Sequence, residues 1–113
     1  MSITPIRMVD GALLATGAAP LFTGDGNSKT IIKRVALTNS DVGARTVDVW
    51  LLPSTATGVA DAYRLCNALS INAGETKILY AAHEQVIHNA GTLVAQSDAA
   101  DKVNAVVSGL KFA

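Results

Sequence analysis

Two runs of alternating β-branched residues, joined by a polar turn, constrain this chain more than any other feature. They form the stretch KTIIKRVALTNSDVGARTVDVWLLP, from Lys29 to Pro53. Alternation with a period of two places successive side chains on opposite faces of a strand, and the glycine-containing stretch between the runs suits a turn. The pattern predicts a β-hairpin. Six side chains are expected to form its core face: Ile31, Val35, Leu37, Val47, Val49 and Leu51.

Comparable pairs of runs continue to the C-terminus. Residues 63–71 and 76–80 flank the sequence NAGE, in which Asn and Gly suit a tight turn. Residues 92–96 and 102–110 flank a second polar turn and predict a closing hairpin. In that hairpin five side chains are expected to pack together: Leu93, Ala95, Val103, Ala105 and Val107. Residues 81–88 are the one segment in which a helical turn competes with a strand.

The composition supports an all-β domain. The chain has 113 residues, which fits one domain, and a domain of this size buries about two thirds of the surface that its unfolded chain exposes. Half of the residues are hydrophobic but only 4% are aromatic, so the core must be aliphatic, which suits sheets packed face to face. We predict a single antiparallel β-sandwich over residues 1–113, Ig-like or jelly-roll-like, with about eight short strands.

The N-terminal segment, residues 1–23, is expected to contribute edge strands and to contact neighbouring subunits. Residues 3–9 alternate and residues 13–22 are small and apolar, and Pro5 and Pro20 favour sheet edges because proline has no amide hydrogen. The uncharged stretch 11–24 is shorter than the roughly 18 apolar residues of a membrane span and is interrupted by glycine and proline. No basic leader precedes an apolar block, so we expect a soluble protein made in the cytoplasm.

The charge balance and the single cysteine exclude several classes of protein. Nine basic residues balance nine acidic ones, so long-range attraction to nucleic acid or to an anionic membrane is not expected. Lys33 and Arg34 point to opposite faces of a strand and do not add up to a basic patch, even beside Arg45. Cys66 alone excludes an intrachain disulfide and a multi-cysteine zinc site, and it is expected to be buried and inert.

No group of residues has the spacing of a catalytic or ligand-binding motif. His83 and His88 are five residues apart, whereas zincin-type ligation needs a spacing of four on one helical face. Residues 24–27, GDGN, supply one carboxylate, too few ligands for calcium. Asp98 and Asp101 fit a hairpin tip, and the chain has neither a G-x-S-x-G motif nor a glycine-rich phosphate loop. We therefore expect no enzyme activity, small-molecule substrate, metal or cofactor.

One apolar group is expected on the outer face of the predicted hairpin. Ile32, Trp50 and Leu52 would form a patch there, and such patches often mark protein contacts. The alternative, given equal weight, is that a second sheet, the N-terminal segment or the loop at 54–62 covers them. Together with the N-terminal segment, the predicted protein interface comprises Leu13, Leu14, Leu21, Phe22, Ile32, Trp50 and Leu52.

Several short motifs follow one another in a recognisable order. They are Thr38-Asn39 at the end of a strand, Leu51-Leu52-Pro53, the AGET turn at 73–76, GTLVA at 91–95 and Val107-Ser108-Gly109 in the closing strand. In this order, and over most of its length, the chain resembles the small β-sandwich virion structural proteins of tailed bacteriophages.

This resemblance implies a non-enzymatic component present in many copies per particle. Its place would be capsid decoration, the neck or collar, or the tail and its fibre attachment. The implied partners are other virion proteins and further copies of the chain, and the implied location is the virion, after synthesis in the host bacterial cytoplasm.

A second class of function stays open from the sequence, a carbohydrate- or receptor-binding β-sandwich module. Sugar-binding platforms usually present several exposed aromatic side chains, whereas this chain has one Trp, two Tyr and two Phe in total. That scarcity favours the structural role over the binding module.

Overall fold

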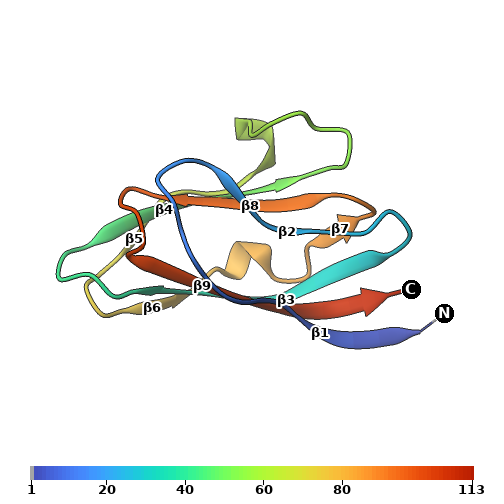
Figure 1. The fold of residues 1–113 in the computed structure, drawn as a ribbon, viewed down its shortest axis with the longest axis horizontal. Coiled ribbons are helices and arrows are strands. Elements are labelled where there is room, and N and C mark those ends of the chain that lie inside the picture. Colours follow the sequence, from blue (N-terminus) through green and yellow to red (C-terminus); the bar gives the residue numbers. More distant parts are fainter. Residues whose placement is uncertain (1) are drawn as a thin grey trace.

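The computed structural model describes residues 2–113, and within them nine strands form two antiparallel sheets packed face to face (Figure 1). The five-stranded sheet has the order β1-β9-β3-β6, and β7 also pairs with β3. Its strands are β1 (Ile3–Leu13), β3 (Lys29–Asn39), β6 (Thr76–Ile78), β7 (Val86–His88) and β9 (Val103–Phe112). The predicted β-sandwich is confirmed.

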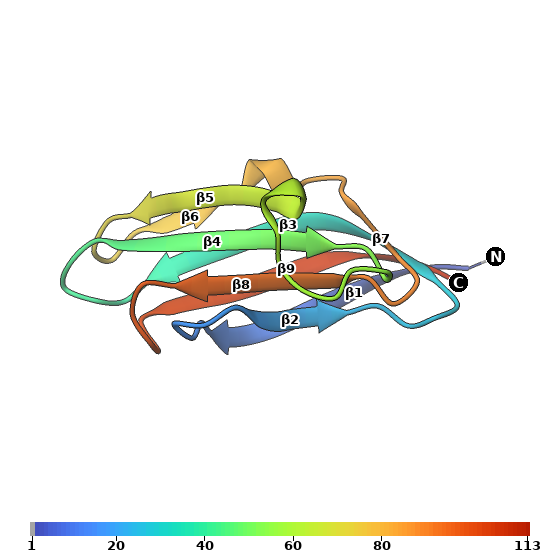
Figure 2. The ribbon, with the colours of Figure 1, turned by 90° about the horizontal axis from the view of Figure 1, so that it is seen from above.

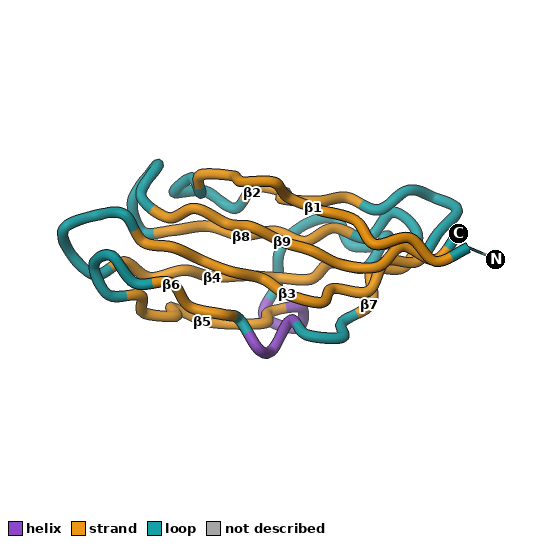
Figure 3. Tube along the Cα trace, turned by 90° about the horizontal axis from the view of Figure 1, so that it is seen from below, coloured by secondary structure: helices purple, strands orange, loops and turns teal. Residues whose placement is uncertain are grey.

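The four-stranded sheet has the order β2-β8-β4-β5. Its strands are β2 (Ala19–Thr23), β4 (Arg45–Leu52), β5 (Arg64–Ile71) and β8 (Thr92–Ser97). Two single 3-10 turns, η1 (Asp61–Tyr63) and η2 (Tyr80–Ala82), lie in the connections, which Figure 3 shows in purple against the orange strands. The segment 81–88, ambiguous in sequence, thus combines the end of η2 with the short strand β7.

The strand pairs are nested along the sequence. β4 pairs with β5, β3 with β6 and β7, β2 with β8, and β1 with β9. Counting β6 and β7 as one interrupted edge strand, this is the double-sheet arrangement of a jelly roll, in which a long antiparallel ribbon folds over on itself. Of the two sandwich types expected from sequence, the topology is the jelly-roll one.

All three predicted hairpins are wrong in their pairing. β3 and β4, β5 and β6, and β8 and β9 are consecutive in the chain, yet the members of each pair lie in different sheets (Figure 2). Each of these turns therefore carries the chain from one sheet to the other. The sequence interpretation had instead placed the two strands of each pair side by side in one sheet. Strand alternation identifies the buried face of each strand, but it does not identify the strand with which it forms hydrogen bonds.

The predicted core residues are nevertheless mostly inside, because facing sheets bury the same alternate positions as paired strands do. Nine of them are buried: Val35, Leu37, Val47, Val49, Leu93, Ala95, Val103, Ala105 and Val107. Leu51 is partly buried against this cluster.

Ile31 is the exception, because β3 contains a β-bulge. The register of β3 against β9 shifts between Ile32 and Arg34, with Lys33 as the extra residue. A bulge reverses which alternate positions face inward, so Ile32 is fully buried and Ile31 lies on the outer face. The prediction that Ile31 belongs to the core and Ile32 to the outer face is therefore wrong.

Gly109 of β9 lies where the backbone of the neighbouring strand β3 leaves no room for a side chain. A Cβ atom there would lie 2.4 Å from the carbonyl oxygen of Ile31 and 2.8 Å from the Met8 sulfur. We expect Gly109→Ala to destabilise the protein by about 1–3 kcal/mol, since a backbone carbonyl cannot move aside as a flexible side chain can. Chemical denaturation measures this difference.

Gly17→Ala is the matched control for that experiment. A Cβ at Gly17 meets no atom within 4 Å, and the loop has no positive φ at this position. We expect this variant to be as stable as the wild type, or up to about 1 kcal/mol more stable. Equal stability of the two alanine variants would contradict the close approach at Gly109.

Candidate protein interface

The subunit itself buries three of the seven residues expected at the interface. The exposed fractions of Ile32, Leu14 and Trp50 are 0%, 2% and 3%. Leu21 and Phe22 pack against the core and Leu52 is half-buried, which leaves Leu13 as the one that is largely exposed. The predicted surface patch of Ile32, Trp50 and Leu52 therefore does not exist as a unit, since the bulge turns Ile32 into the core.

Trp50 is covered on the outer face of the four-stranded sheet. The guanidinium carbon of Arg64 lies 4.8 Å from the centre of the indole ring, and Arg64 is held by the Asp48 carboxylate at 2.8 Å. The segment 53–63 folds back over this sheet and its turn η1 contacts β4 (Figure 1). Trp50 is therefore covered, as in the second alternative drawn from the sequence, whereas Leu52 is only half-buried and Ile32 belongs to the core.

A different apolar surface lies on the outer face of the five-stranded sheet, near both chain ends. The pairing register aligns Pro5, Leu110, Ile31 and Val86 in one row across four strands. The row one step nearer the chain ends aligns Ile3 and Phe112 with Lys29 and His88. We call the apolar members of these rows the outer apolar patch: Ile3, Pro5, Ile31, Val86, Leu110 and Phe112.

The burial of the residues between the two rows confirms which way the patch faces. Thr30 and Ile87 occupy the intermediate row and are almost fully buried, at 2% and 1% exposed. Alternate positions therefore point outward, and Ile3 and Val86 are 57% and 39% exposed. The patch is the outward half of strands whose inward half forms the core.

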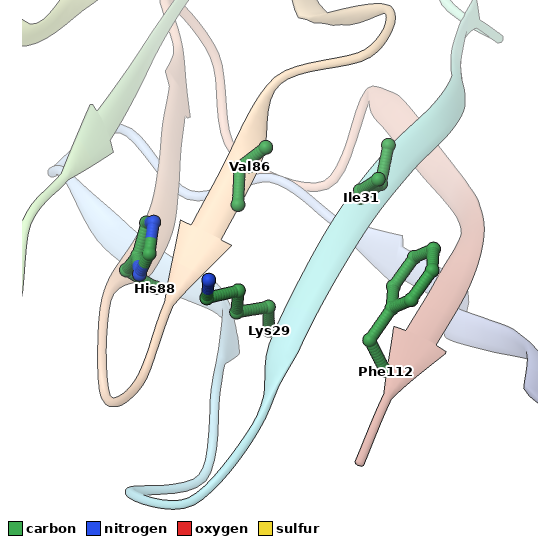
Figure 4. Close-up of a pocket in the computed structure, with 5 residues that line it drawn as sticks. All are labelled: Lys29, Ile31, Val86, His88 and Phe112. Carbon is green, nitrogen blue, oxygen red and sulfur yellow. The ribbon is translucent and has the colours of Figure 1, made fainter. Parts of the chain in front are cut away.

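The patch is hollowed at its centre. A shallow pocket of about 300 Å³ is lined by Lys29, Ile31, Val86, His88 and Phe112. Figure 4 shows the side chains of Val86, Ile31 and Phe112 spaced across three adjacent strands, with Lys29 and His88 together at one side. The pocket is mainly apolar and the Lys29 ammonium lies at its side, so it suits an apolar side chain accompanied by negative charge.

The border of the patch is basic. Lys29 and His88 lie beside the pocket. Arg7 and Arg34 flank Ser108 in the next row on the same face, on the side of the patch away from the chain ends. Within residues 2–113 no carboxylate lies within ion-pair distance of Lys29 or Arg34, and Arg7 approaches only the exposed Asp10, at 3.7 Å. The uncompensated positive charge around an apolar centre is the main electrostatic feature of this face.

The ionisable groups elsewhere are engaged in structural contacts. The Lys111 ammonium, at 2.7 Å, holds the pKa of Asp25 well below its ordinary value, with help from the Ser28 hydroxyl and the Asn27 amide. Burial raises the pKa of the half-buried Cys66 thiol, so this thiol stays protonated and weakly nucleophilic. Over the described part of the chain, no three His, Cys, Asp or Glu side chains gather closely enough to hold a metal ion.

The outer apolar patch was missed by reasoning from sequence. A signal existed in the last strand, where Leu110 ends the predicted run and Phe112 continues the alternation across Lys111. The other half of the signal, that Ile31 belongs with them, depends on the bulge.

None of the helices in residues 2–113 has the length and apolar character needed to cross a membrane.

Comparisons with known proteins relate the fold to subunits of large assemblies. A chain of Bacillus endospore appendages, which are disulfide-linked pili, superposes with a TM-score of 0.56 at 12% identity, over 98% of this chain and 88% of that one. A chain of the T13 viral particle of IBDV gives 0.55 at 12% identity, over 97% of this chain and 30% of the viral one. A chain of the infectious bursal disease virus Gx strain gives 0.50 at 16% identity, with 97% and 30% covered.

This chain therefore spans nearly the whole pilus subunit but less than a third of the viral chains that it matches. No family model matches it, and no curated protein does. At these identities the likeness establishes the fold and not the function. The chain is a β-sandwich of the kind found in a spore pilus and in a viral particle.

Proposed function

We propose that this protein is a non-enzymatic structural subunit that assembles in many copies through its outer apolar patch. The observation that carries the proposal is the patch itself, six apolar side chains aligned in two rows on an otherwise solvated sheet face, with a basic border. Contiguous exposed apolar surface is unfavourable in water unless a partner covers it, and partners of such patches are usually other proteins.

The more specific form of the proposal is a virion component of a tailed bacteriophage. The order of motifs from Thr38-Asn39 to Val107-Ser108-Gly109 supports it, as does the occurrence of this fold in a viral particle and in pili. The protein would serve as a decoration, neck or tail component, with other virion proteins as partners. Labelled protein that fails to sediment with phage particles from its own host would count against this form.

The assembly through the patch is tested with charged substitutions at two of its exposed residues, Ile3 and Val86. The double variant Ile3→Asp, Val86→Asp, called the patch variant, places carboxylates where apolar contact is proposed. We expect its self-association, measured by sedimentation across protein concentration, to be at least about tenfold weaker than that of the wild type. Circular dichroism and thermal unfolding establish that the variant remains folded.

Val59→Asp is the matched control, because Val59 is 42% exposed but lies in the segment 53–63, away from the patch. We expect it to associate like the wild type. Strong association of the patch variant, or equal weakening by the control, would contradict the proposal. The predicted contact through the N-terminal segment stays a prediction. Leu13→Asp tests it, since the Leu13 side chain is 56% exposed although its backbone pairs with Asn104 of β9; weaker self-association of this variant would support the contact.

A further inference from the structure

The basic border of the outer apolar patch restricts what can cover it. A twofold contact between two identical patches would bring Lys29, Arg7 and Arg34 of one copy toward the same residues of the other, where like charges repel. A surface that is apolar at its centre and acidic around it would therefore be complementary to the patch. The chain itself presents such a surface at its other end.

That surface is the loop joining β3 to β4, residues 40–44. Val42 is 98% exposed there, the highest exposure among the large hydrophobic side chains of residues 2–113. Figures 1 and 2 place this loop at one end of the long axis and the two chain termini, beside the patch, at the other. The molecule measures 46 Å along that axis, so Val42 cannot reach the patch of its own subunit.

The loop holds Val42 in a fixed position. The fully buried Asn39 side chain donates hydrogen bonds to the carbonyl oxygens of Gly43 and Ile71, both at 2.9 Å, and accepts one from the Asp41 amide. The Asp41 carboxylate in turn accepts from the Val42 amide at 2.8 Å and from Arg45 Nε at 2.7 Å. An ordered, protruding valine loses little conformational entropy when it binds, which favours its use as a contact.

The surroundings of Val42 are acidic on balance. The neighbouring turn 98–101 joins the same end of the molecule, because the Ser40 amide donates to the Lys102 carbonyl at 2.9 Å and the Thr46 amide to the Asp98 carboxylate at 3.2 Å. The turn 72–75 lies at this end too, because the Asn39 amide donates to the Glu75 carbonyl at 2.9 Å. The charged side chains of these turns and of the adjoining start of β4 are the carboxylates Asp41, Glu75, Asp98 and Asp101 and the cations Arg45 and Lys102. Arg45 is already engaged by Asp41 and Asp98, the latter at 3.8 Å.

We propose that the outer apolar patch of one subunit receives the 40–44 loop of a second copy, with Val42 seated in the pocket between Ile31, Val86 and Phe112. This inference rests on the proposed function and names its partner. The acidic groups beside Val42 then lie opposite Lys29, His88 and the two border arginines. We call Val42 the knob. Because the knob and the pocket lie at opposite ends of one subunit, the contact is head-to-tail, and it extends into a ring or a filament.

The test uses two variants that each remove one half of the contact. Val42→Asp, the knob variant, keeps an intact patch, while the patch variant keeps an intact Val42. We expect the wild type to form species larger than a dimer as its concentration rises, and each variant alone to remain monomeric. An equimolar mixture of the two variants is expected to form dimers and nothing larger, because only one intact knob-and-pocket pair is available.

Sedimentation velocity distinguishes these outcomes, with Val59→Asp as the control that assembles like the wild type. A mixture that stays monomeric while the wild type assembles would overturn the head-to-tail contact. A knob variant that assembles normally beside a monomeric patch variant would also overturn it, and would leave the patch as an interface for another partner. A wild type that is monomeric at all concentrations would overturn self-assembly through the patch altogether.

Discussion

Replacing Trp50 with alanine is expected to destabilise the folded subunit by about 3–5 kcal/mol, the usual cost of removing a large buried aromatic side chain. Only 3% of this residue is exposed, and its ring is packed beneath the Arg64 guanidinium. The truncation would also leave Arg64 without its aromatic contact, above a cavity. Urea or guanidinium unfolding followed by circular dichroism measures the loss.

Trp50→Phe separates the packing of the ring from the role of its polar atom. Phenylalanine keeps an aromatic face below Arg64 and removes the indole N–H, which is buried and, within residues 2–113, has no hydrogen-bond partner. Since removing an unsatisfied buried donor offsets part of the lost volume, we expect a cost of about 1 kcal/mol or less. If Trp50→Ala were as stable as the wild type but failed to associate, Trp50 would be a contact residue, as the sequence interpretation of a surface patch required.

The buried faces of the strands could be predicted from sequence because they depend on local alternation alone. Val35, Leu37, Val47 and Val49 were assigned to the core from a period of two, and all four are at most 1% exposed. From β3 onward the strand bounds are also close to the predicted runs, since glycine, asparagine and proline mark the ends of strands through their own backbone preferences. In the N-terminal segment they differ, because β1 continues to Leu13 and β2 begins only at Ala19.

The pairing of the strands could not be predicted, because a turn sequence does not state whether the chain reverses within a sheet or crosses to the facing one. The β3–β4 connection contains Asp41 and Gly43 and follows Asn39 at the end of β3, a composition that also suits a hairpin turn. Here Asn39 bonds across to the carbonyl oxygen of Ile71, at the end of β5 in the other sheet. Such contacts join residues far apart in sequence, and local patterns carry no trace of them.

The candidate interface was missed for a related reason. Its members come from β1, β3, β7 and β9, and only the register of all four strands brings them into two rows. Reasoning from sequence instead proposed Ile32, Trp50 and Leu52 as a patch, with cover by another segment as an equal alternative. It gave no sign that the Arg64 side chain would lie over the Trp50 ring. Surface patches depend on the tertiary fold more than the core does, because any facing sheet buries the inward positions.

Because of the bulge in β3, the adjacent residues Ile31 and Ile32 are expected to differ strongly in their contribution to stability. Ile32→Ala removes a fully buried side chain and is expected to destabilise the protein by about 2–5 kcal/mol. Ile31→Ala removes a side chain from the outer face, where the loss is one of strand propensity and partial packing, about 1 kcal/mol. Denaturant titration of both variants at the same protein concentration measures the difference.

The same pair of variants also separates stability from assembly. Ile31 lines the pocket, so its replacement is expected to weaken self-association while leaving the monomer folded. Ile32→Ala is expected to lower the stability of the fold and to leave the contact unchanged.

In a regular strand without the bulge, Ile31→Ala would cost more stability than Ile32→Ala, because strict alternation would place Ile31 on the core face with Val35 and Leu37. The doublet Ile31-Ile32 followed by Lys33-Arg34 breaks that alternation in the sequence itself, since two apolar and then two charged residues cannot both follow a period of two. The bulge at Lys33 resolves this conflict by turning Ile32 into the core and leaving Ile31 on the outer face.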